Sequence, residues 1–203
     1  MNELVDTKTR LLDAATTLFA QKGYRGASVR DITARAEANL GGVTYHFGSK
    51  ATLYEEALRY SLQPLVERIT EAASTRGTPT ERILAVATTH FSFLSDRPQL
   101  RQLFLQLLQE EVTIPERVAA LARQVIGTVG QLVVEGQRDG TIRSGDPRLL
   151  TVAIMAQPIM LNVLRPMLRV GPQIDLDDPE TRERALANAL RFIRAGLDPS
   201  TEV

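Results

Sequence analysis

The chain of 203 residues contains no cysteine and only two histidines, His46 and His90. The absence of cysteine excludes disulfides, thiolate metal sites and cysteine nucleophiles. Two histidines are too few for a histidine-rich metal site, so we predict no metal and no other cofactor. Paired acids, a nucleophile with its base and a glycine-rich phosphate loop are also missing. The chain is therefore not expected to be an enzyme, and no catalytic residue is predicted.

Long uninterrupted hydrophobic runs are missing as well. The most apolar stretch, residues 149–168, contains Pro158, Arg165 and Pro166 together with two amide side chains. Prolines and a charge within so short a segment predict a helix buried in protein rather than a membrane span. The N-terminus shows no basic segment followed by a long apolar run, so no signal peptide is expected. We therefore expect a cytoplasmic protein without a membrane partner.

Lysine is scarce and unevenly placed. All three lysines, Lys8, Lys22 and Lys50, lie in the first 50 residues, although the formal net charge of the chain is zero. From Lys22 to Lys50, five basic residues stand against two acidic ones, a local charge of +3. Residues 61–203 carry 16 basic and 17 acidic side chains, a charge of −1. A locally basic segment on a neutral body fits a DNA-reading head joined to a sensing body.

Apolar residues recur at helical spacing along almost the whole chain, which predicts an all-α fold of about nine helices. The first helix is expected over residues 7–22 and is ended by Gly23. The second, over 28–36, is expected to be capped by Ser28, whose hydroxyl can accept from the amide of Asp31. Asn39 is the predicted cap of a very short third helix. These three helices form a head, residues 1–50.

Six longer helices are predicted to follow in a body of residues 51–203. The first begins after Ser49 and runs to about residue 74, and a break at 75–79 leads to a helix that opens at Pro79 or Thr80. The last two long helices are expected over 147–169 and 179–196. The first of these is apolar on more than one side, so it must bury a second face.

The two short helices joined by residues 37–40 have the size of a helix-turn-helix motif. Two segments, Ser28–Ile32 and Ala38–Lys50, resemble the TetR family of bacterial repressors. The triplet Tyr45–His46–Phe47 followed by Ser49 and Lys50 is the most specific part. The resemblance covers about residues 7–60 at the level of motifs. It implies a dimeric regulator whose second short helix enters the major groove of a palindromic operator in double-stranded DNA.

Physical roles follow for the residues of this motif. Gly41 and Gly42 carry no side-chain bulk, so the reading helix can approach base edges closely. Thr44 suits a thymine methyl or a phosphate, whereas Tyr45 and His46 can donate to phosphate oxygens. Lys50 adds positive charge near a helix N-terminus. The predicted DNA-binding residues are Ser28, Arg30, Asn39, Gly41, Gly42, Thr44, Tyr45, His46 and Lys50, with Tyr24 as a weaker candidate.

Two further features of the motif concern its core and its choice of operator. Val43 and Phe47 are expected in the core of the head rather than on DNA. The sequence also departs from the family pattern, because many members have an aromatic residue where Thr44 stands and a basic or polar one where Leu40 stands. This departure bears on which operator is read, not on whether DNA is bound.

The resemblance also implies an effector pocket in the body and a homodimer made by the last two long helices, about 147–169 and 179–196. Methionines suit a pocket that must repack around varied ligands, and no charged residue clearly faces this region, so we expect a small apolar effector that releases the operator. An alternative is a helical DNA-binding protein of the same fold that recruits a protein partner and has no small-molecule effector. The candidate effector-binding residues are His90, Phe91, Phe104, Leu107, Met155, Gln157, Met160 and Asn162.

Overall fold

The computed structural model describes residues 2–109 and 114–201, and in these residues it contains ten α-helices and no strand. The predicted all-α fold is confirmed. The helices are α1 (Asn2–Gly26), α2 (Val29–Arg35), α3 (Gly42–Phe47), α4 (Lys50–Ala73), α5 (Pro79–Ser95), α6 (Pro98–Gln109), α7 (Glu116–Asp139), α8 (Pro147–Val163), α9 (Arg165–Val170) and α10 (Pro179–Leu197), followed by a short 3₁₀ helix, Pro199–Thr201.

The helices divide between two compact units. Unit 1 consists of Met1–Pro64 and Arg97–Leu121, and unit 2 consists of Leu65–Asp96 and Ala122–Val203. Within unit 1, α6 packs against α1. The sequence pattern did not indicate that α6 belongs with the N-terminal helices. The helices α4 and α7 each contribute to both units, and Pro64 lies inside α4 at the point where the first segment of unit 1 ends.

Unit 1 has an apolar core to which α1 contributes most. Leu11, Ala15 and Phe19 are fully buried at helical spacing, and Ile32 of α2 and Leu53 of α4 join them. Burying this stripe removes apolar surface from water and fixes α2 and α3 against the long first helix. The helix α1 begins at Asn2, earlier than the predicted residue 7.

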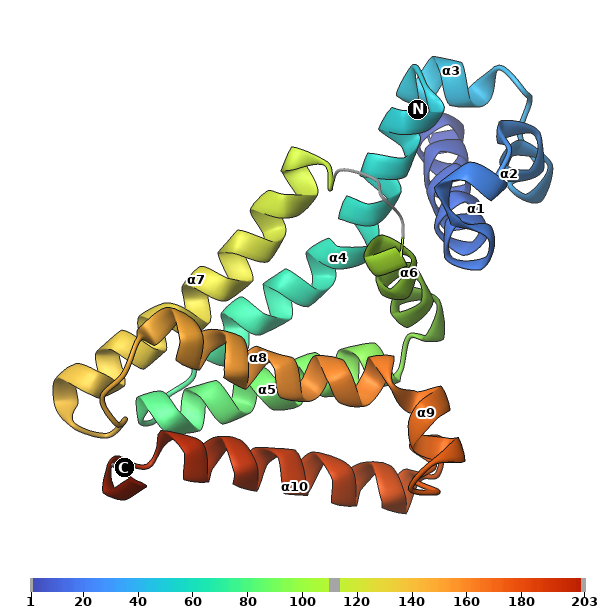
Figure 1. The fold of residues 1–203 in the computed structure, drawn as a ribbon. Helices are drawn as coiled ribbons and strands as arrows, with labels where there is room; N and C mark the ends of the chain where they lie inside the picture. Colours follow the sequence, from blue (N-terminus) through green and yellow to red (C-terminus); the bar gives the residue numbers. More distant parts are fainter. Residues whose placement is uncertain (1, 110–113, 202–203) are drawn as a thin grey trace. The chain divides into compact units, whose positions relative to one another are not determined.

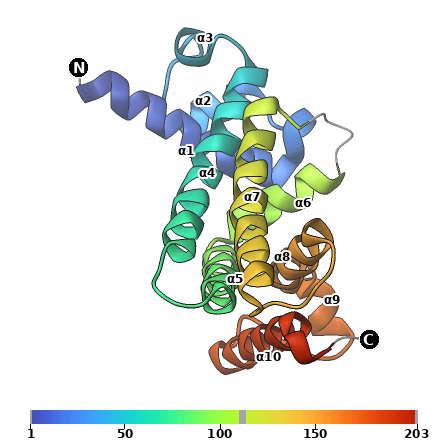
Figure 2. The same cartoon turned by 90° about the vertical axis from the view of Figure 1, so that its left-hand side faces the viewer.

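Unit 2 is built around α5, which packs on both α8 and α10 (Figures 1 and 2). The start of α5 is a capping box, because the Thr78 hydroxyl accepts from the Glu81 amide while the Glu81 carboxylate accepts from the Thr78 amide. Pro79 occupies the first turn, where no intrahelical donor is needed, as the sequence predicted. The helix then buries Ile83, Phe91 and other apolar side chains.

The predicted single helix over 147–169 is wrong in one respect. The helix α8 ends at Val163, and a separate helix, α9, begins at Arg165. Pro166 explains the break, because it has no amide hydrogen for the carbonyl of Asn162 and its ring crowds that carbonyl. The chain consequently has ten helices where about nine were expected.

One described helix, α7, has the length and hydropathy of a membrane span, with 28% of its apolar window buried. A core helix of a soluble protein meets the same criterion. The stretch 149–168 lies in α8 and α9, and neither helix is long enough to meet the criterion for a membrane span.

Candidate DNA-binding site

A helix-turn-helix occupies residues 28–47 in unit 1. Ser28 caps α2 by accepting a hydrogen bond from the Asp31 amide at 3.0 Å, as predicted. The turn after α2 is fixed by a hydrogen bond from the Ala38 amide to the Thr33 carbonyl, 2.9 Å, and Glu37 takes a positive φ of 49° there. The Gly42 amide then donates to the Asn39 carbonyl at 2.8 Å, just before α3. These bonds hold the two short helices in a fixed arrangement.

The helix α3 is amphipathic. Its Val43 and Phe47 side chains are buried, which confirms their predicted place in the core. On the opposite side, Thr44 is exposed and Tyr45 is 74% exposed, and the ring of His46 lies edge-on to that of Tyr45. A buried face that locks the helix to the core and a free polar face beside it are what a base-reading helix requires.

Packing within the protein does not require glycine at the start of α3. A Cβ atom built at Gly41 meets nothing within 4 Å, and one at Gly42 meets the Leu11 side chain at an ordinary 3.5 Å. Neither residue has a positive φ. Any small residue would therefore fit, and the lack of bulk keeps the end of α3 open to an external surface.

Asn39 does not cap α3, contrary to expectation. The N-cap position belongs to Gly41, and no side chain donates or accepts there. Asn39 contributes its backbone carbonyl instead, and its side chain is exposed. The short turn brings its carbonyl, rather than its amide group, to the free amide of Gly42.

Lys50 is the first residue of α4 and lies next to the motif. Ser49 precedes it and caps the helix by accepting from the Thr52 amide at 3.1 Å. The Lys50 ammonium lies over the ring of Tyr24, 4.6 Å from its centroid. The sequence named Tyr24 only as a possible DNA contact, and the pairing with Lys50 was not foreseen.

The nine predicted DNA-binding residues all lie in unit 1, and none of them is buried. Six of the nine are exposed, and Gly42, His46 and Lys50 are half-buried. No group of three or more His, Asp or Glu in the described residues is arranged to hold a metal ion. These residues offer hydroxyl, imidazole and ammonium donors, which are the groups that bind phosphate oxygens.

The predicted effector-binding residues are divided between the units. Phe104 and Leu107 lie on α6 in unit 1, and the other six lie on α5 and α8 in unit 2. Phe91 and Met155 are buried, Gln157 is half-buried, and Met160 is 39% exposed.

Asn162 has its hydrogen-bonding groups engaged by the protein. Its amide nitrogen donates to the Phe91 carbonyl at 3.2 Å and to the Pro158 carbonyl at 3.0 Å, and its oxygen accepts from the Ser95 hydroxyl at 3.1 Å. This side chain joins α8 to the end of α5 and leaves little capacity for a ligand.

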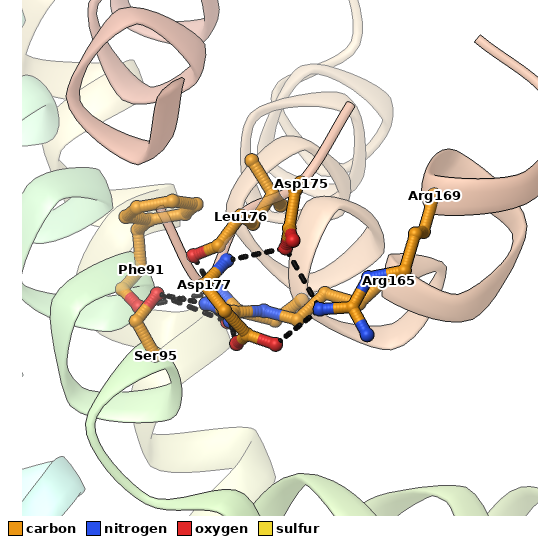
Figure 3. Close-up of polar contacts among 8 residues, drawn as sticks. Phe91, Ser95, Arg165, Arg169, Asp175, Leu176 and Asp177 are labelled. Carbon is orange, nitrogen blue, oxygen red and sulfur yellow. Dashed lines mark hydrogen bonds and ion pairs between the residues drawn. The ribbon is translucent and has the colours of Figure 1, made fainter. Parts of the chain in front are cut away.

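An arginine cluster extends these contacts to the loop before α10 (Figure 3). Arg165, 11% exposed, donates to the Ser95 hydroxyl at 3.0 Å and pairs with Asp177 at 2.7 Å. Arg169 bridges Asp175 and Asp177 at 2.8 and 2.6 Å. Burial lowers the pKa of Arg165, while Asp177 acts in the opposite direction. The cluster fastens α9 and the following loop to α5.

Unlike Asn162, His90 has a buried polar atom without a hydrogen-bond partner among the described residues. The residue is buried in α5, and the atom is its Nδ1. Burial lowers the pKa of His90 to about 4, so the imidazole is neutral at physiological pH. A buried polar atom without a partner is unfavourable by itself, and a ligand with one polar group would relieve it.

Comparisons with known proteins agree with this geometry. Residues 11–57 match the family model for bacterial regulatory proteins of the tetR family, and residues 58–159 match that for the C-terminal region of YsiA-like proteins. The chain belongs to the TetR family. The helix-turn-helix of this TetR-family protein is therefore a DNA-binding motif, and its relatives are transcriptional regulators rather than enzymes.

Individual relatives are identical to this chain at between one fifth and one third of the aligned residues. The probable HTH-type transcriptional regulator YttP of Bacillus subtilis (strain 168) is 31% identical over 140 residues, which span 64% of either chain. The fatty acid metabolism regulator protein of the same organism is 24% identical over 69% of this chain and 73% of its own length. Among solved structures, the transcriptional regulator FadR from Bacillus subtilis in complex with stearoyl-CoA has a TM-score of 0.78 at 20% identity, over 93% of this chain and 98% of that one.

Proposed function

We propose that this TetR-family protein is a ligand-responsive repressor in the cytoplasm that binds a palindromic operator as a homodimer. The observation that carries the proposal is the two-sided character of α3, with Val43 and Phe47 buried and Thr44 and Tyr45 free. Each protomer places one such helix in a major groove, about one DNA turn, roughly 34 Å, from its partner.

We infer that the dimer forms through α8 and α10. Both helices bear large apolar side chains on their exposed faces, and Leu149, Val152 and Phe192 are 70, 59 and 66% exposed. An isolated protomer would leave these residues in water, whereas a second copy would bury them in a twofold bundle of four helices. A palindromic operator requires the same twofold symmetry.

For the effector we propose a long-chain acyl compound, most simply an acyl-CoA thioester. Unit 2 supplies the buried side chains of Phe91, Phe93 and Met155 for an alkyl chain and, in His90, one polar atom that has no partner among the described residues. Two relatives named above are described by fatty acid metabolism or by bound stearoyl-CoA. Effector binding favours a body conformation in which the two reading helices no longer match the operator.

The test begins with selection of bound fragments from genomic DNA by the full-length protein. Titration of the selected duplex then compares wild type with Lys50→Ala and Tyr45→Ala, and Arg138→Ala serves as a control that removes a positive charge from unit 2. We expect weaker binding for the two head variants, with a salt dependence shallower by about one unit per protomer for Lys50→Ala. Equal affinity of all four proteins would overturn the assigned site.

Stearoyl-CoA is then added to the complex. Release of DNA, together with a thermal shift that operator opposes, supports the proposed response, because coupling between two ligands is reciprocal. Coenzyme A alone is the control without an acyl chain. If DNA binds and stearoyl-CoA changes neither affinity nor melting temperature, this effector class is wrong, and regulation through a protein partner becomes the better explanation.

A further inference from the structure

The three lysines of the chain are held in different ways. Lys22 pairs with Asp31 at 3.2 Å. Lys8 and Lys50 instead lie over aromatic rings, Lys8 at 5.7 Å from the centroid of Phe47 and Lys50 at 4.6 Å from that of Tyr24. A carboxylate holds an ammonium group by cancelling its charge. The face of an aromatic ring attracts the ammonium through its quadrupole and leaves the net charge intact.

No carboxylate pairs with Lys50 in the parts of the chain that the structure describes. The acids nearest to it along α4 are Glu55 and Glu56, and both are taken by other partners. Arg117 approaches Glu55 at 3.6 Å and Glu56 at 3.3 Å, and Arg59 binds Glu56 at 2.9 Å. The positive charge of Lys50 is therefore not neutralised from within its own helix.

Tyr24 is itself firmly placed. Gly23 adopts φ 68° and ψ 177°, a conformation that side chains other than glycine's rarely allow, and this turns the chain inside α1 just before Tyr24. The ring of Tyr24 then packs at 5.0 Å from that of Tyr54 and at 6.2 Å from that of Phe19, both of which are buried. A fixed ring restricts the ammonium that lies on it.

We propose that Tyr24 is a positioning residue for Lys50: its ring holds the ammonium near α3 without pairing it to a carboxylate, so that it can bind a DNA phosphate. This inference rests on the proposed DNA binding. A lysine on a flexible stem loses rotamer freedom when it binds a phosphate. The ring restricts the side chain beforehand, so less freedom is lost on binding. The chemistry recognised is that of a backbone phosphate, which carries no sequence information.

The test is a double-mutant cycle on duplex affinity. Tyr24→Leu removes the ring, and we expect it to weaken binding about two- to fivefold when Lys50 is present. In the Lys50→Ala background the same substitution should have no effect. The matched control is the Lys22→Ala background, where the full effect of Tyr24→Leu should remain, because Lys22 does not lie on this ring.

Two other outcomes would overturn the inference. A purely structural role predicts the same loss in all three backgrounds. A direct contact of the Tyr24 hydroxyl with DNA predicts that Tyr24→Phe is as weak as Tyr24→Leu, whereas we expect Tyr24→Phe to bind as tightly as wild type, since the ring face is retained. If wild type itself does not bind duplex DNA, the proposed function fails, which is a distinct result.

A measurement on wild type alone covers the case in which Tyr24→Leu does not fold. Lysine labelled with ¹³C at Cε gives one signal for each of three lysines, because the chain contains no others. We expect the Lys50 ε-methylene protons to be shifted upfield by the ring current of Tyr24. Lys50→Arg assigns the signal by its disappearance. A Lys50 signal at the position of an unstructured lysine would show that the ring does not hold it.

Discussion

The Lys22 ammonium lies 3.2 Å from a carboxylate oxygen of Asp31, which joins α1 to the first turn of α2. Both side chains are about half exposed, so the pair is accessible to ions and to DNA. Lys22 and the Ser28 hydroxyl both hold the pKa of Asp31 below its usual value. The carboxylate is consequently ionised at neutral pH, and it cancels the charge of one of the few lysines in the head.

We therefore expect Asp31→Asn to tighten binding to duplexes of any sequence. The substitution frees one cation next to the DNA-binding surface, which adds up to about one unit per protomer to the salt dependence. Anisotropy titrations with a scrambled duplex over a range of salt measure both effects. Glu37→Gln is the control, because it changes the charge of the same motif without releasing a lysine. A smaller gain for Asp31→Asn than for Glu37→Gln would contradict this prediction.

Gly41→Ala should separate folding from DNA binding. A Cβ atom at this position meets nothing within 4 Å, so the free energy of unfolding should change by less than about 1 kcal/mol. Operator affinity should fall by at least about tenfold if the backbone must approach base edges there. Gly127→Ala in α7, where a Cβ atom also meets nothing, is the matched control and should leave DNA affinity unchanged. Undiminished affinity in Gly41→Ala would show that this glycine is only a turn residue.

His90 should make unit 2 sensitive to mild acid. Its folded-state pKa of about 4 lies below the usual 6.5, so between these values the unfolded chain binds more protons. Stability therefore falls as pH drops through this window, by about 2 kcal/mol between pH 7.5 and 5. Denaturant unfolding at the two pH values measures it. His90→Gln, which does not titrate, should lose less stability over that interval than wild type, and an identical loss would be inconsistent with a buried neutral imidazole.

Asn162→Ala should destabilise the protein by about 1–3 kcal/mol, because the Phe91 carbonyl and the Ser95 hydroxyl would each lose one hydrogen bond in a buried site. Met160→Ala, also in α8, is the comparison. The Met160 side chain is 39% exposed, so its removal should lower the free energy of unfolding by less. Thermal unfolding ranks the two variants. If Asn162→Ala keeps full stability but loses the response to stearoyl-CoA, the residue is a ligand contact, as the sequence suggested.

Phe192→Glu should convert the proposed dimer into a monomer. Phe192 is 66% exposed in α10, and a charge would be buried without a partner if a second copy packed there. Light scattering after size exclusion reports the molar mass directly. Gln131→Glu, on an exposed position of α7, adds the same charge as a control. A dimer that survives Phe192→Glu unchanged would place the contact elsewhere.

Local patterns were sufficient to predict much of unit 1. The Ser28 cap depends on residues three positions apart, and the burial of Val43 and Phe47 follows from helical spacing, so both could be read from the sequence. The pairing of Lys50 with Tyr24 could not, because it depends on the left-handed turn at Gly23 and on the packing of α4 beside α1. The Lys22–Asp31 pair also crosses between two helices.

In unit 2 the sequence predicted the positions of the helices better than the side-chain contacts between them. Apolar spacing located α5, α8 and α10, but Pro166 divides the expected helix, and the signal for that break was present in the sequence. Asn162 was proposed as a ligand contact because it is one of two amide side chains, with Gln157, in a largely apolar helix. Its bonds to Ser95 and Phe91 come from a segment about 70 residues away, which no local pattern reveals.

Pro64 interrupts the backbone hydrogen bonding in the middle of α4. Without an amide hydrogen it leaves the Tyr60 carbonyl, one turn earlier, without the usual helical donor. Bending the helix at this point therefore breaks one hydrogen bond fewer than bending it elsewhere. The same residue is the last of the first segment of unit 1, so the carbonyl without a helical donor lies just before α4 passes from unit 1 to unit 2. The helix nevertheless continues through Pro64 to Ala73, so the proline removes one helical hydrogen bond without ending the helix.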